Sequence, residues 1–126
     1  MSSAANRIDI WSVLVLDMFN YMDPEDGEFL VEGFGSPEAA IEYARRRTRD
    51  SLEEQRPDAR DAEDLRDRWF MFGESCIAMG TDYRASEEID VFIANPATPE
   101  EIDWVSLEPD PERRALLMAV AKQSGE

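Results

Sequence analysis

The sequence contains no histidine and a single cysteine, Cys76. Histidine is the commonest metal ligand and the commonest general base near neutral pH, so its absence removes both from the available chemistry. One cysteine excludes an intrachain disulfide and is typical of a reducing compartment. We therefore expect a cytoplasmic protein with no cofactor and no metal site, and we expect no enzyme that depends on histidine.

Basic residues are also scarce, with 13 against 29 acidic residues, which gives a net charge of -16. Nucleic acids and anionic membranes both require a basic surface, so neither is an expected direct partner. All the basic residues except Lys122 are arginine, which favours a GC-rich bacterial coding sequence.

Long apolar runs are missing as well. The longest one, Trp11 to Phe19, is interrupted by Ser12 and Asp17 and is too short to span a bilayer. The first residues show no basic segment followed by an apolar run, so no secretory signal is expected.

The length and the apolar content fit one folded domain. The chain has 126 residues, of which 43% are hydrophobic and 10% aromatic, and this is enough for a packed core. We expect a single acidic domain over residues 1–126, with flexible ends at 1–6 and 123–126.

Residues 8–34 are expected to form a β-hairpin. The first strand covers residues 8–19, and turn-forming Asp23, Pro24 and Gly27 precede the second strand. Both faces of the first strand are apolar, which predicts a central strand, a covering C-terminal helix or contact with another subunit. One face carries Ile8, Ile10, Leu14, Leu16 and Met18, and the other carries Trp11, Val13, Val15 and Phe19.

Two helices should follow. Ser36 and Pro37 are typical of a helix start, and the apolar spacing predicts a helix to about residue 55, before Pro57. A second helix is expected over residues 60–72, although residues 69–72 are also compatible with the start of a strand.

The remaining chain predicts a second hairpin and two short helices. Residues 75–80 and 88–95 have the character of strands, and helices are expected to start at Thr98 and at Asp110. The fold class is therefore α+β, in the order strand-strand-helix-helix-strand-strand-helix-helix. Its two antiparallel hairpins form one sheet of about four strands, with helices packed against it.

Charge is unevenly distributed along the chain. Residues 1–35 carry a net charge of -6 and residues 74–107 a net charge of -7, whereas residues 36–56 are neutral. The acidic segments are interpreted as solvated surface or as a face for a basic partner. Arg45 and Arg49, one helical turn apart, could contact an anion, but an exposed helix with internal ion pairs is the favoured interpretation.

Several side chains could in principle carry chemistry. The acids Asp23, Glu25, Asp26 and Glu28 lack the spacing of a calcium loop and are better explained by a turn. Without a histidine partner, Cys76 is expected to be a small buried residue and no nucleophile.

The sequence leaves more than one role possible for two carboxylates and one tryptophan. Asp17 and Asp90 lie within apolar segments and could form an acid–base pair, but the sequence does not tell whether they share a pocket. Trp104 is expected either to hold the tail onto the sheet or to contact a partner.

No catalytic residue can be named, and the favoured function is a non-catalytic protein-interaction, regulatory or accessory module, homodimeric or bound to another protein. Its expected contact residues are Trp11, Val13, Val15 and Trp104. One alternative is a small enzyme subunit or ligand-binding domain that uses carboxylates and aromatic residues. Another is an acidic inhibitor that mimics nucleic acid.

Overall fold

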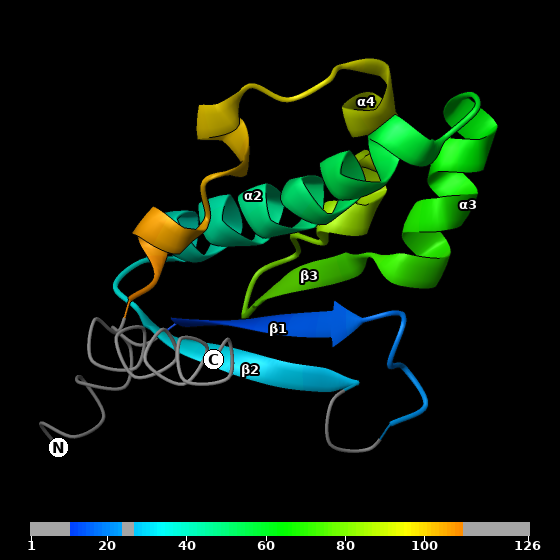
Figure 1. The fold of residues 1–126 in the computed structure, drawn as a ribbon. Coiled ribbons are helices and arrows are strands. Elements are labelled where there is room, and N and C mark those ends of the chain that lie inside the picture. The colour runs from blue at the N-terminus through cyan, green and yellow to red at the C-terminus, as the bar shows by residue number, and fades with distance from the viewer. Residues whose placement is uncertain (1–10, 24–26, 110–126) are drawn as a thin grey trace, which may run out of the picture.

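Three antiparallel strands form one sheet, and the helices pack on one side of it (Figure 1). The computed structural model describes residues 11–23 and 27–109. β1 (Trp11–Asp17) is the central strand, between β2 (Glu28–Phe34) and β3 (Glu74–Met79). The predicted α+β class is confirmed, but within the described ranges the sheet has three strands where about four were expected.

The first predicted hairpin is confirmed, because β1 pairs antiparallel with β2. Val13 lies opposite Val31, and both are buried. The register shifts between Trp11 and Ser12, and Gly33 on the partner strand has a φ of 105°. Glycine tolerates this left-handed conformation, so it permits the local irregularity in the ladder.

The predicted first helix is confirmed as α2 (Pro37–Gln55). Ser36 is the N-cap, and its hydroxyl oxygen accepts a hydrogen bond from the amide of Ala39 at 3.1 Å. α2 lies across β1 and β3 and buries one face against them. The buried residues of that face are Ala40, Tyr43, Ala44, Thr48, Ser51 and Leu52.

α3 (Ala62–Phe72) confirms the second predicted helix and shows that residues 69–72 are helical. Asp61 caps its start by accepting a hydrogen bond from the amide of Asp64 at 2.8 Å. Gly73 ends it, and a Cβ atom at that position would lie 2.3 Å from Cδ1 of Trp69. Only glycine therefore lets the chain turn directly into β3.

The predicted strand over residues 88–95 is wrong. A 3₁₀ turn, η2 (Ala85–Glu88), leads into the short helix α4 (Ile89–Ala94). Ile89 and Phe92 are three residues apart and both are buried in a cluster with Trp69, whereas Val91 is 57% exposed. Alternating apolar residues suggested a strand, but burial follows the helical spacing.

The segment after α4 runs back along α2 as two 3₁₀ turns, η3 (Pro99–Ile102) and η4 (Val105–Leu107). The capping box predicted at Thr98 is present, with Glu101 as its second member. A further 3₁₀ turn, η1 (Arg56–Asp58), continues α2. The helix expected from Asp110, and the ends expected to be flexible, lie outside the described residues. None of the described helices combines the length and apolarity needed to cross a membrane.

The outer edge of β3 is bonded by groups of the same chain. The amide of Glu74 donates to the hydroxyl oxygen of Ser51 at 2.9 Å, and that of Cys76 donates to Thr48 Oγ1 at 3.0 Å. Two residues further on, the amide of Ala78 donates to the carbonyl oxygen of Tyr83 at 3.2 Å. Every second amide along this edge is therefore satisfied without another strand.

The sheet face turned away from α2 is also apolar. Because side chains alternate along a strand, Leu14 and Leu16 point to this side, and Leu14 has Leu30 and Ile77 as its neighbours across the sheet. Within residues 11–23 and 27–109, no helix lies on this face. A covering C-terminal helix and contact with another subunit therefore both stay predictions for this face.

Replacement of Thr48 by valine should destabilise the fold, because it keeps the shape but leaves the buried amide of Cys76 without an acceptor. We expect the free energy of unfolding, measured in urea, to fall by about 1–3 kcal/mol. Thr48→Ser retains the hydroxyl and serves as the matched control, with a smaller loss. Equal losses in the two variants would contradict the role given to this hydrogen bond.

Candidate functional site

Exposed aromatic and methionine side chains gather on two segments that meet at one end of the sheet. Phe19 is 66% exposed and Phe72 is 44% exposed, and their ring centroids are 5.7 Å apart. The loop after β1 and the end of α3 also expose four further large apolar residues. These are Tyr21, Met22, Phe70 and Met71, but successive residues of α3 point about 100° apart, so they do not all share one face. We therefore name only the contacting pair, Phe19 and Phe72, the aromatic patch.

The sequence around Asp17 shapes the loop that presents Phe19. The Asp17 carboxylate accepts hydrogen bonds from the amides of Phe19 at 3.1 Å and Asn20 at 3.3 Å. This short polar side chain thereby bends the chain directly after β1. The amide of Met18 also donates to the carbonyl oxygen of Gly73 at 3.0 Å, which joins the loop to the end of α3.

A cleft of about 210 Å³ lies beside the patch. Phe72 belongs to both regions, because it contacts Phe19 and also lines the cleft. Asp17 lines the cleft and holds the loop that carries Phe19. Four carboxylates and one guanidinium line the cleft, so its ionised groups sum to -3. We name it the acidic cleft, lined by Asp17, Arg47, Asp50, Ser51, Glu54, Phe72, Glu74 and Trp104.

Arg47 is the cation of the acidic cleft and is held on several sides. Its guanidinium pairs with both oxygens of Glu74 at 2.8 and 3.2 Å and lies 4.2 Å from the ring centroid of Trp104. It also donates to the hydroxyl of Tyr43 at 2.7 Å. Burial lowers the pKa of Arg47, but the hydrogen bonds and the ion pair with Glu74 outweigh this effect, so the pKa lies above its ordinary value.

Glu54 differs from the other acids that line the cleft. Asp50 accepts a hydrogen bond from Nε1 of Trp104 at 2.9 Å, and Glu74 is paired with Arg47. Among the described residues, Glu54 makes no hydrogen bond or ion pair. Partial burial, followed by the charges of Asp50 and Glu74, raises the pKa of Glu54 above its ordinary value, although the residue remains exposed. A cation near this carboxylate would relieve that repulsion.

The structure places the expected contact residues mostly in the core. Val13 and Val15 are 0% exposed beneath α2, and Trp11 packs against the same core cluster. The half-buried Trp104 packs edge-on against Tyr43, with centroids 5.8 Å apart. Burial thus removes Val13 and Val15 from the surface, and it is Phe19 that is exposed beyond the end of the strand.

Arg45 and Arg49, considered as an anion contact, both have partners within the chain. Arg45 donates to Glu42 at 2.9 Å and to Glu88 at 3.0 Å. Arg49 donates to the carbonyl oxygen of Asn95 at 2.6 Å and lies 3.7 Å from a carboxylate oxygen of Glu101. An incoming anion would have to displace these partners, which favours the interpretation as a salt-bridged helix.

Within the part of the chain that the structure describes, Asp17 and Asp90 lie at separate places. Asp17 ends β1 at the acidic cleft, whereas Asp90 is exposed on α4 and pairs with Arg66 at 2.7 Å. An acid–base pair between them is therefore excluded by their positions.

Part of the acidic turn weighed for calcium, Glu25 and Asp26, lies outside the described residues. Within the described ranges, no three histidine, cysteine, aspartate or glutamate side chains are grouped so that they could hold a metal ion.

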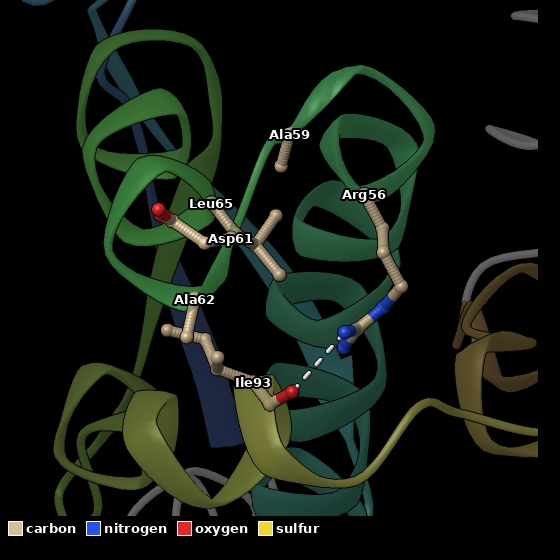
Figure 2. A pocket seen from close by; sticks show the side chains of 6 residues that line it. All are labelled: Arg56, Ala59, Asp61, Ala62, Leu65 and Ile93. Carbon is tan, nitrogen blue, oxygen red and sulfur yellow. Dashed lines mark hydrogen bonds between the residues drawn. The ribbon is translucent and has the colours of Figure 1, made fainter.

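A second hollow, of about 260 Å³, lies between the end of α2, the start of α3 and α4 (Figure 2). Its guanidinium, that of Arg56, donates to the carbonyl oxygens of Ile93 at 3.1 Å and Phe92 at 3.0 Å and also pairs with Glu53. Its carboxylate, that of Asp61, caps α3. These polar groups hold helix ends, so the hollow offers little for a ligand to bind.

In comparisons with known proteins, no family model, no curated protein and no solved structure matches the chain.

Cys76 should be unreactive in the native protein. It is 0% exposed, and burial raises the pKa of its thiol to about 12. The thiolate is the nucleophile, so we expect negligible reaction with a disulfide reagent at pH 8 until urea unfolds the chain. Rapid labelling of the folded protein would contradict this placement.

Glu54→Gln should stabilise the protein at pH 7. A carboxyl group with a higher pKa in the folded chain than in the unfolded chain weakens folding as the pH rises through that interval. The gain in melting temperature should therefore disappear below about pH 4, where both states are protonated. Glu32→Gln, on β2, removes one negative charge outside the cleft and is the control. It shows how much of the stabilisation comes from a lower net negative charge in general.

Proposed function

We propose that this chain is a cytoplasmic, non-catalytic protein-interaction module of an accessory or regulatory kind. The observation that carries the proposal is the exposed contact between Phe19 and Phe72. Large exposed apolar patches on a folded chain are typical of interaction sites. Aromatic residues are also enriched among those that dominate binding energies.

The free energy available at this patch is sufficient for a specific contact. Burial of one phenylalanine side chain contributes about 1.5–3 kcal/mol. The backbone that carries Phe19 is held by Asp17 and by the bond between Met18 and Gly73, so little ordering is needed on binding. The patch is thus prepared for a partner, which is either another protein or a second copy of this chain.

A small enzyme or ligand-binding domain is the second candidate, favoured by the position of Asp17 and Trp104 in one cleft. Small-molecule sites usually measure about 300–1,000 Å³. At about 210 Å³, the acidic cleft is better matched to a single side chain than to a metabolite.

A mimic of nucleic acid has less support. Mimicry needs a row of unpaired carboxylates, and many acids here are bound to arginines of the same chain. Glu42 pairs with Arg45 and Arg46. Glu53, Glu74 and Glu88 each pair with one arginine.

A photo-crosslinking residue at position 19 tests the interaction role. In the native host, we expect a discrete crosslinked product from position 19 and none from position 91, an exposed apolar site on α4 that serves as the control. Sedimentation of the purified chain identifies a homodimer. A monomer whose crosslinking is the same from both positions would refute the proposed function.

A further inference from the structure

We propose that the aromatic patch and the acidic cleft together form one docking surface for a basic, amphipathic segment of a partner protein. An arginine or lysine side chain of that segment enters the cleft, while a neighbouring apolar side chain packs on Phe19 and Phe72. This docking surface presupposes the interaction role proposed above and specifies the chemistry of the partner.

The two halves of the surface are continuous through Phe72. Phe72 contacts Phe19 and is also one of the residues that line the acidic cleft. Side chains three or four residues apart on a helix lie about 5–6 Å from each other. A helical segment with an apolar residue and a basic residue at that spacing therefore presents both groups to the surface at once.

The charge of the cleft selects a cation. Its ionised groups sum to -3, and Glu54 has no partner among the described residues. Asp50 and Glu74 lie close enough to disfavour the ionised form of Glu54. A guanidinium or ammonium group placed there is attracted by this net negative charge, which already includes the guanidinium of Arg47, whereas an anion is repelled by it.

The chain already holds one guanidinium by the same means. Arg47 is bound by both oxygens of Glu74 and is covered by the ring of Trp104. A fork of carboxylate oxygens beside an aromatic ring is the environment that suits arginine best. Glu54 lines the same cleft and has no partner within residues 11–23 and 27–109, so it offers a second, incoming cation a comparable carboxylate.

The overall charge favours another protein over a second copy. With a net charge of -16, two copies repel each other at long range, whereas a basic partner is steered towards the surface. The acidic cleft sits beside the apolar contact, so this repulsion acts where a second copy would dock.

Selection from a random peptide library displayed on phage tests the partner chemistry without knowledge of the natural partner. The full chain is the bait, and Phe19→Ser/Phe72→Ser is the counter-selection bait. Circular dichroism checks that this variant folds. We expect enriched peptides to carry arginine or lysine three or four residues from an aromatic or large aliphatic residue.

The enriched peptides are then synthesised and titrated against single variants. Phe19→Ser should weaken binding about tenfold or more. Val91→Ser, which also replaces an exposed apolar side chain by serine but on α4, should leave binding unchanged. Glu54→Gln should weaken binding about threefold or more and flatten its salt dependence, whereas Glu32→Gln should not.

The outcomes separate the two proposals. Enriched peptides that depend on Phe19 but are neutral or acidic would overturn the docking of a basic segment and leave the interaction role standing. Dimerisation of the chain through Phe19 would do the same. Failure to enrich any peptide that depends on Phe19 or Phe72 would overturn the docking surface, and with the crosslinking result it would overturn the interaction role as well.

Discussion

Two hydroxyl groups on the buried side of α2 determine how the helices sit on the sheet. Thr48 Oγ1 and Ser51 Oγ accept hydrogen bonds from the amides of Cys76 and Glu74 on the outer edge of β3. Ser51 Oγ also accepts one from Nε1 of Trp69 at 3.2 Å, so α2, α3 and β3 meet at one oxygen atom. Buried polar groups must be paired, and this arrangement pairs them in only one relative position of the three elements.

The candidate site follows from that junction. Because Trp69 is fixed against Ser51, the end of α3 is fixed too, and the tight turn at Gly73 places Phe72 and Glu74 on either side of it. Glu74 then reaches Arg47 on α2, one turn before Ser51. Residues that line the cleft, such as Ser51 and Glu74, thus also join α2, α3 and β3. The opening of the cleft and the neighbouring aromatic rings remain exposed to solvent.

Strong local signals explain what the sequence predicted correctly. The Ser36–Pro37 start identified α2, and the turn residues between two apolar runs identified the first hairpin. Residues 88–95 were misjudged because a short apolar run fits either a strand or a helix, and only contact with Trp69 decides. The site was not predicted because Phe19 and Phe72 are distant in sequence. The only signal in the sequence was that each phenylalanine stands at the end of an expected strand or helix.

The saturated edge of β3 also protects the protein from misassembly. Edge strands with open donors can recruit strands from other molecules, and many proteins guard them with lysine or proline. The interior of β3, Ser75 to Ala78, contains no charged residue and no proline, yet every second amide from Glu74 to Ala78 is already bonded. An apolar, cysteine-containing strand can therefore lie at the border of the sheet without acting as a template for aggregation.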